Sequence, residues 1–231
     1  MMFFGGYGIY LLFSLPALLL GMWAQYKVKS AFEHYSKVRS YTGLTGAEVA
    51  RRMLDNHGLN NVKVEQVGGF LSDYYDPTTR TLRLSPEVYQ ANSLAAAGVA
   101  AHESGHAVQH AEGYSALKFR TAMVPSVQIG SWLGPIIFMV GYFFSSNSLA
   151  WAGLILFGLT ALFALVTLPV ELNATSRAKS WLSTSGVVYN TEMEGINRVL
   201  DAAALTYVAA AIQAISTVLY YLFLLLGRRR D

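Results

Sequence analysis

The chain contains no cysteine and little charge of either sign. Only 13% of its 231 residues are Asp, Glu, Lys or Arg, whereas soluble domains carry about 25%. Without cysteine, disulfide bonds, thiolate metal ligands and a cysteine nucleophile are excluded. The net charge is only +3, and no basic run alternates with aromatic residues, so no nucleic-acid partner is expected. Such a shortage of charge is typical of a chain that faces lipid over much of its length.

Four long uncharged segments predict four transmembrane helices. Each holds about 20 residues, or about 30 Å of helix, which matches the hydrocarbon thickness of a bilayer. The first segment has no Lys or Arg before it and no small-residue cleavage site after it, so we interpret it as an anchor and not as a signal peptide. The segments run from Phe3 to Trp23, Val124 to Phe144, Leu149 to Val170 and Leu205 to Leu226.

The remaining residues form two polar stretches on either side of a membrane hairpin. We expect the first helix over 1–24, a polar region over 25–122, the hairpin of helices two and three over 123–170, a helical region over 171–204, and the fourth helix and tail over 205–231. The linker Ser145-Ser146-Asn147-Ser148 is so short that it predicts a tight helical turn.

Local patterns predict that the polar stretches form a small α+β domain. A strand is expected over 62–67, and the segments 70–75 and 80–85 flank a turn at Asp76-Pro77, which predicts a β-hairpin. Capping boxes at Thr45/Glu48 and Thr191/Glu194 predict two helix starts, the second helix running toward the fourth apolar segment. Other helices are expected from 86, over 92–112 and over 171–182.

The positions of Lys and Arg predict which side of the membrane holds the polar region. Basic residues near the ends of the apolar segments favour a cytosolic polar region and an external amino terminus. Arg228, Arg229 and Arg230 conflict with this orientation, so the fourth segment either crosses regardless or lies partly in the interface. The basic residues on the polar side are Lys27, Lys29, Lys37, Arg39, Lys118, Arg120, Arg177 and Lys179.

The segment His102-Glu103-Ser104-Gly105-His106 has the pattern of a zinc site. Two histidines four residues apart share one face of a helix, so both imidazoles can reach a single Zn²⁺. Glu103 lies at the edge of that face, where a carboxylate can polarise a water without binding the metal. The motif therefore predicts metal-assisted hydrolysis with Glu103 as general base.

His110 is a weaker candidate, because the residue after His106 is Ala107 and the pair His106/His110 lacks a neighbouring glutamate. His102 and His110 lie about 12 Å apart along a helix axis, which excludes all three histidines on one ion. We expect His110 on the polar surface, with a role beside the metal ligands or facing a substrate as alternatives.

A catalytic zinc needs a third protein ligand and one open position. No histidine follows residue 110, so a later ligand must be a carboxylate. The chain has no Asp-Gly pair of the kind found in site-2-type proteases, and position 112 is Glu where a metzincin has His. Glu171 leads because it lies where the third apolar segment returns to the polar region. The alternatives, which also fit capping or surface roles, are Glu192, Glu194 and Asp201.

The order of these features resembles that of known membrane peptidases. The histidine motif, a two-span hairpin and then Glu171-Leu172-Asn173-Ala174-Thr175 are similar to HtpX-type and CaaX-processing membrane endopeptidases, which are gluzincins. The chain resembles still more closely the YugP family of bacterial membrane zinc peptidases. The matching segments, spread over nearly the whole chain, are Asp73–Pro77, Leu84-Ser85, Ala100–Glu103, Pro169–Glu171 and Ala203–Ala209.

The resemblance implies a mostly α membrane protein with about four transmembrane helices and a small α+β zincin-like catalytic domain. It implies Zn²⁺ on His102, His106 and Glu171, membrane-associated proteins or peptides as substrates, and a bacterial plasma (inner) membrane location. Thr175 replaces the aspartate of the wider gluzincin motif, and Tyr74 stands where many relatives have histidine. The Thr175 hydroxyl or Asn173 can accept the N–H of a ligand histidine.

The leading interpretation is a membrane-embedded zinc endopeptidase. The strand from Arg80 to Ser85 is expected to be the sheet edge that holds an extended substrate, and Arg177, Arg198 or a tyrosine to stabilise the oxyanion. The alternatives are an intramembrane protease of the site-2 type and a non-catalytic scaffold or holdase with a structural zinc site. Glu103 separates them, because a purely structural site has no use for a base beside its ligands.

Overall fold

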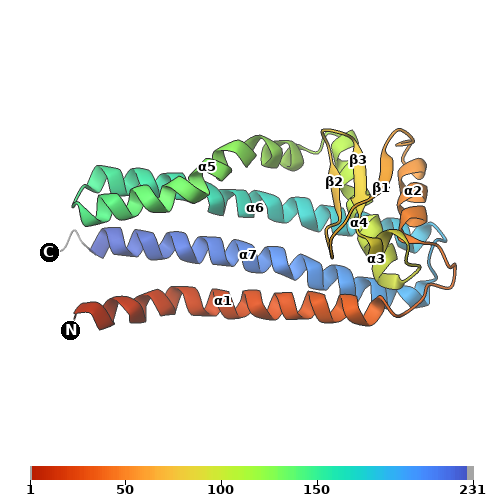
Figure 1. Ribbon diagram of the computed structural model, residues 1–231, viewed down its shortest axis with the longest axis horizontal. Coiled ribbons are helices and arrows are strands. Elements are labelled where there is room, and N and C mark those ends of the chain that lie inside the picture. Colours follow the sequence, from red (N-terminus) through yellow and green to blue (C-terminus); the bar gives the residue numbers. More distant parts are fainter. Residues whose placement is uncertain (1, 228–231) are drawn as a thin grey trace. The chain divides into compact units, whose positions relative to one another are not determined.

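The computed structural model describes residues 2–227, with side chains from residue 8 onward, and it is mostly helical with one small sheet (Figure 1). The chain divides into two compact units. Unit 1 is built from the residues up to Ala24, from Phe119–Pro169 and from Thr206 onward, and unit 2 from Gln25–Lys118 and Val170–Leu205. The predicted Arg228–Arg230 tail lies outside the described residues.

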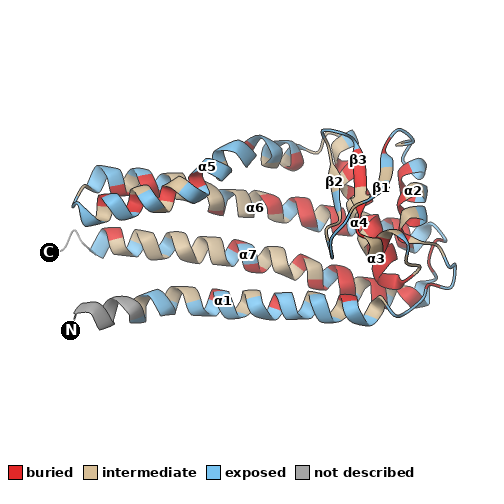
Figure 2. Cartoon of the chain, viewed as in Figure 1, coloured by how far each residue is buried: buried red, intermediate tan, exposed pale blue. Residues whose placement is uncertain are grey.

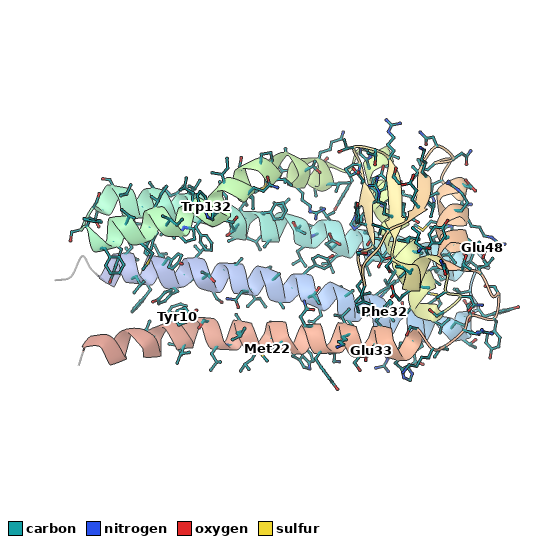
Figure 3. All side chains as sticks on the ribbon, viewed as in Figure 1. Tyr10, Met22, Phe32, Glu33, Glu48 and Trp132 are labelled. Carbon is teal, nitrogen blue, oxygen red and sulfur yellow. The ribbon has the colours of Figure 1, made fainter. Side chains whose placement is uncertain are left out.

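Four helices are long and apolar enough to cross a membrane, as predicted. Many of their large apolar side chains are exposed, among them Met22 on α1 and Trp132 on α5 (Figure 3). Exposed residues also run along much of α1 (Figure 2). Apolar faces without a protein partner need lipid around them. The helices are α1 (Met2–Tyr35), α5 (Ser115–Phe143), α6 (Asn147–Thr184) and α7 (Met193–Gly227).

In unit 1, α5 and α6 form the predicted hairpin and approach each other closely. The turn between them passes through Ser145, which has a φ of 61°. A Cβ added at Gly130 would lie 2.6 Å from the carbonyl oxygen of Leu156, and one added at Gly153 would overlap the backbone of Phe138. Small residues that bring two backbones together are a usual means of joining helices in a membrane, where the hydrophobic effect adds little.

Unit 2 contains a three-stranded sheet with the order β1-β3-β2. The strands are β1 (Lys63–Gln66), β2 (Tyr74–Asp76) and β3 (Thr81–Leu84). The antiparallel pairing of β2 and β3 confirms the predicted hairpin. The expectation that the Arg80–Ser85 strand forms the sheet edge is wrong, because β1 pairs with β3 in parallel on its other side. The free edges therefore belong to β1 and β2.

The helix α4 (Leu94–Ala111) lies at the centre of unit 2 and packs against α2 (Gly46–Asn56), α3 (Pro86–Tyr89) and the sheet. It begins at Ser93, whose hydroxyl accepts the N–H of Ala96 at 3.1 Å. Buried alanines fill much of its surface, and buried residues gather around it in Figure 2. Because alanine side chains are short, neighbouring elements can pack close to the α4 backbone.

Two expected helix starts are wrong. No helix starts at Glu171, because α6 is continuous through Pro169, which removes one backbone donor without ending the helix. The capping box at Thr191/Glu194 is replaced by a 3₁₀ turn over Asn190–Glu192 that leads into α7. There the Glu192 carboxylate accepts the N–H groups of Tyr189 at 2.7 Å and Tyr41 at 2.9 Å. The predicted box at Thr45/Glu48 is confirmed.

The close approach of α5 and α6 predicts different effects of alanine at two glycines of α6. Gly153→Ala must push the helices apart and should lower the free energy of unfolding by about 1–3 kcal/mol, the usual cost of overpacking. Gly158→Ala is the matched control, because nothing lies within 4 Å of its added Cβ. The measurement is reversible unfolding in mixed micelles, followed by circular dichroism. Equal stability of the two variants would contradict the packing described.

Candidate metal centre

Three metal-binding side chains meet in unit 2. His102 and His106 come from successive turns of α4, and Glu171 comes from α6. Each histidine Nε2 lies 3.3 Å from the Glu171 Oε2, and one ligand atom from each of the three lies within 4.8 Å of the others. All three side chains are largely buried.

The spacing of these atoms suits a tetrahedral Zn²⁺. With metal–ligand bonds of about 2.0–2.1 Å, two ligand atoms of a tetrahedron lie about 3.3 Å apart. The two distances to the Glu171 carboxylate match this separation. The donor set of two imidazoles and one carboxylate is also one that zinc hydrolases use, with the fourth position left open. The residues present therefore fit the metal that the sequence predicts.

A close contact between α4 and α6 makes this arrangement possible. A Cβ added at Gly105 would lie 2.9 Å from the carbonyl oxygen of Ala174 and 3.3 Å from its Cα. Only glycine lets the two backbones approach so closely. Gly105 lies between His102 and His106 along the chain, so the contact brings Glu171 within reach of both rings.

Each histidine is held through its other ring nitrogen. The Nδ1 of His102 lies 3.2 Å from the hydroxyl of Thr175, and the Nδ1 of His106 lies 3.0 Å from the Oε1 of Gln109. Such contacts orient a metal-binding imidazole and direct its Nε2 toward the ion. The sequence offered two acceptors for a histidine N–H. Thr175 contacts His102 directly, whereas Asn173 contacts Gln109, which in turn contacts His106.

The hydrogen bonds around Gln109 determine which nitrogen of His106 carries the proton. The Nε–H of Arg177 only donates, so the Asn173 atom that it contacts at 2.7 Å is the oxygen. Gln109 donates its amide N–H groups to that oxygen at 2.9 Å and to the carbonyl of Val170 at 2.8 Å. The Gln109 atom that faces His106 must then be the acceptor, so Nδ1 is protonated and Nε2 keeps its lone pair for a metal.

Gln109 was not identified from the sequence. Its side chain is fully buried in α4, where a polar residue needs hydrogen-bond partners. Its position three residues after His106 puts both on one face of the helix, and this spacing was the available signal. Nothing in the sequence shows that the partners lie on α6.

The other candidates lie outside the group of three ligands. Arg177 pairs with Glu112 at 2.7 Å, and Arg198 pairs with Glu194 on the surface at 3.2 Å, so both guanidinium groups are engaged. His110 donates to or accepts from the Tyr75 hydroxyl at 2.9 Å. Among the rival third ligands, Glu192 caps a backbone turn and Asp201 pairs with Lys179.

Glu103 lies beside this centre without belonging to the group of ligands. Its side chain remains partly open to solvent. Burial among protein atoms raises the pKa of the Glu103 carboxyl, the positive charges that His106 and His102 can carry oppose the rise, and the charges of Glu171 and Asp73 add to it. A raised pKa suits a carboxylate that must accept a proton and later release it.

Comparison with known proteins identifies a family and a relative of this chain. The profile of a protein family described as "Putative neutral zinc metallopeptidase" matches residues 10–226. A curated protein of Bacillus subtilis (strain 168), named "Putative membrane protease YugP", is 48% identical over 223 residues, covering 96% of this chain and 99% of its own length. No solved structure matches the chain.

The geometry predicts a graded loss of zinc among variants. The purified protein should carry about one zinc per chain, and His102→Ala, His106→Ala and Glu171→Ala should each lose most of it, because three ligands are needed to hold the ion. Gln109→Leu should bind zinc about 10–100-fold more weakly, since it loses only the group that orients His106. Elemental analysis and titration with a competing chelator measure both effects.

Glu194→Gln serves as the control for this series, because Glu194 is an exposed carboxylate paired with Arg198. It should retain full zinc content. Full occupancy in Glu171→Ala would remove Glu171 from the ligand set, and unchanged affinity in Gln109→Leu would remove the orienting role of Gln109.

Proposed function

The chain belongs to the family described as "Putative neutral zinc metallopeptidase", and we propose that it is a membrane-embedded zinc endopeptidase of the gluzincin type. The observation that supports this most is the meeting of His102, His106 and Glu171 at tetrahedral spacing, with Glu103 beside them. A structural zinc site would need four protein ligands. Among the described residues, three gather here, which leaves a position for a water or a substrate.

In the proposed reaction, Glu103 moves the protons. A Zn²⁺ ion in this site would supply Lewis acidity, polarising the peptide carbonyl and making water more acidic. Glu103 accepts a proton from the water that attacks the peptide carbon. The carbon–nitrogen bond then breaks, and Glu103 delivers that proton to the leaving amine nitrogen. Thr175 and Gln109 keep the histidine rings in place throughout.

The substrate is proposed to be an extended peptide that pairs with β2. This strand is an edge of the sheet and packs against α4, the helix that carries Glu103. An edge strand offers free N–H and C=O groups, so a peptide can bind through its main chain whatever its sequence. The four long apolar helices favour proteins and peptides associated with the bilayer as substrates.

We further propose that unit 2 lies in the cytosol of a bacterial-type plasma membrane, because most Lys and Arg near the apolar helices flank the polar stretches. A reporter inserted at Ser145–Ser148 should then behave as external, and a reporter near Gly68 as cytosolic. Alkaline phosphatase and green fluorescent protein fusions measure these two states. The reverse pattern would place the site outside the cell and make the terminal arginines the orienting charges.

The substitution Glu103→Gln tests the proposed chemistry. It keeps the size of the side chain and its hydrogen bonding but removes the base, so peptide cleavage should fall by at least about 10²–10⁴-fold. Zinc content and membrane insertion should remain as in the wild type, because Glu103 is not one of the three ligands. Cleavage of fluorogenic peptides by the purified protein is the measurement.

Glu194→Gln is again the matched control and should cleave at the wild-type rate. Complementation of a deletion strain gives an independent result. If Glu103→Gln restored the strain as well as the wild type does, the protein would be a scaffold and the peptidase proposal would fail even with zinc bound.

A further inference from the structure

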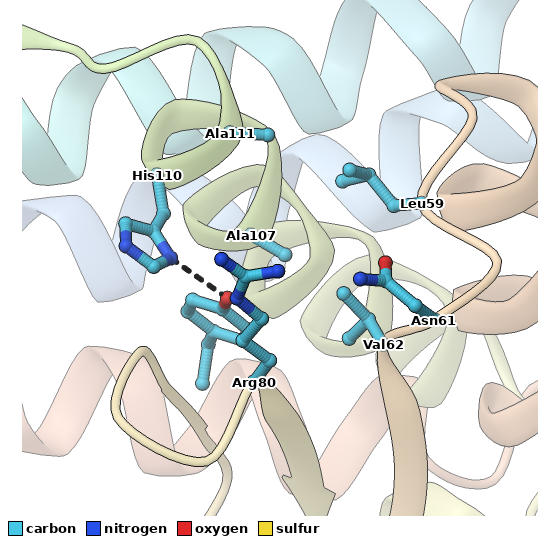
Figure 4. A pocket seen from close by; sticks show the side chains of 8 residues that line it. Leu59, Asn61, Val62, Arg80, Ala107, His110 and Ala111 are labelled. Carbon is cyan, nitrogen blue, oxygen red and sulfur yellow. Dashed lines mark hydrogen bonds between the residues drawn. The ribbon is translucent and has the colours of Figure 1, made fainter.

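A pocket of about 300 Å³ lies beside the second half of α4, next to β2 and the beginnings of β1 and β3 (Figure 4). This volume is at the small end of the range for ligand sites, about 300–1,000 Å³. It therefore suits a single side chain or chain end. The residues lining it are Leu59, Asn61, Val62, Tyr75, Arg80, Ala107, His110 and Ala111.

Arg80 is the only lining residue with a permanent charge, and no acidic residue lines the pocket. Two other arginines of unit 2 are paired: Arg83 contacts Asp76 at 2.9 Å, and Arg51 contacts Asp55 at 2.9 Å. Within the described part of the chain, the Arg80 guanidinium has no such partner. Its charge acts on the Tyr75 hydroxyl, where it opposes the rise in pKa that burial causes.

The backbone conformation of Arg80 is unusual for a residue other than glycine. Its φ is 49°, in the left-handed region that favours glycine. The residue ends the turn between β2 and β3, and its side chain extends over the pocket toward α4, where Ala107 and His110 lie (Figure 4). Such conformations occur in the turns of hairpins and also gather at ligand-binding sites.

The pocket is adjacent to the metal centre along α4. His110 follows His106 by one turn, which is about 6 Å along the helix axis, and follows Glu103 by about 10 Å. An extended peptide advances about 3.3 Å per residue. A group in the pocket would therefore belong to a residue about two or three positions from the bond that is cleaved.

We propose that this pocket binds a carboxylate of the peptide substrate, two or three residues from the cleaved bond. This inference rests on the proposed peptidase function. The planar guanidinium of Arg80 can donate two parallel hydrogen bonds to a carboxylate. The Asn61 amide adds a neutral donor, and Leu59 and Val62 contact the methylene groups that carry the acid.

Two sources can supply the carboxylate: a Glu or Asp side chain within the peptide, or the free carboxyl terminus of a short peptide. Both present the same planar anion to Arg80. They differ in whether the substrate can continue beyond the pocket, so the test includes both.

The test measures peptide binding to the full-length Glu103→Gln protein in detergent micelles, so that no peptide is cleaved. The probes are fluorescent apolar peptides with blocked ends that carry one Glu, Gln or Lys at successive positions. Peptides with Gln and a free carboxyl terminus form the second arm. At one position, the peptide with Glu should bind about tenfold more tightly than the peptide with Gln. Alternatively, the peptide with a free carboxyl terminus should bind about tenfold more tightly than the blocked peptide. Fluorescence anisotropy measures both dissociation constants.

Adding Arg80→Gln should remove this preference, and Arg80→Lys should restore part of it, because lysine keeps the charge without the bidentate geometry. Arg52→Gln is the control, since Arg52 is exposed and does not line the pocket, and it should leave the preference unchanged. Circular dichroism and zinc content verify that each variant is folded.

Equal binding of Glu, Gln and both chain ends would overturn the proposal, as would a preference that survives Arg80→Gln or no binding of any peptide. Cleavage by the protein with Glu103 intact separates the two proposals. Cleavage without an acidic preference refutes the pocket alone. An Arg80-dependent acidic preference without cleavage refutes the peptidase function alone.

Discussion

The whole candidate site depends on the contact between α4 and α6 at Gly105. A Cβ at position 105 would lie only 2.9 Å from the carbonyl oxygen of Ala174, so glycine lets the two backbones come together. This contact allows one helix to supply two imidazoles and the other a carboxylate, with 3.3 Å between their ligand atoms. It also brings Thr175 and Asn173 to the far side of the histidine rings. The ligands and the groups that orient them thus follow from a single close approach.

The hydrogen bonds behind His106 form a connected network that crosses this contact. His106 reaches Gln109, Gln109 reaches Asn173, and Asn173 accepts from Arg177. Each group can act only as donor or only as acceptor at each contact. The reason is that the network ends in the Arg177 guanidinium, which only donates, and in the Val170 carbonyl, which only accepts. Such a network keeps a proton on Nδ1 of His106, so Nε2 is the nitrogen that can bind a metal. Pre-oriented ligands lose less conformational entropy when the ion binds, which favours affinity.

Charged residues are few in this chain, and they are unevenly distributed between the two units. Long apolar helices leave 31 charged side chains among 231 residues. Unit 2 holds most of the acidic and basic groups, and it uses them in pairs such as Arg177 with Glu112 and Lys179 with Asp201. Within the described residues, Arg80 forms no such pair, and it lines a cavity next to the proposed active site.

The four long helices could be predicted from the length of their uncharged segments. Helix geometry was enough to place His102 and His106 on one face and Glu103 at its edge, because residues near in sequence are fixed in space by one repeat. The third ligand stayed open among Glu171, Glu192, Glu194 and Asp201, since sequence distance does not show which helices touch. For the same reason, Gln109 was missed and the Arg80–Ser85 strand was placed at the sheet edge. The partners of Gln109 and the pairing of β1 with β3 involve residues far apart along the chain. Only tertiary packing decides such contacts, because they depend on which backbones can approach each other and which polar groups are left to be paired.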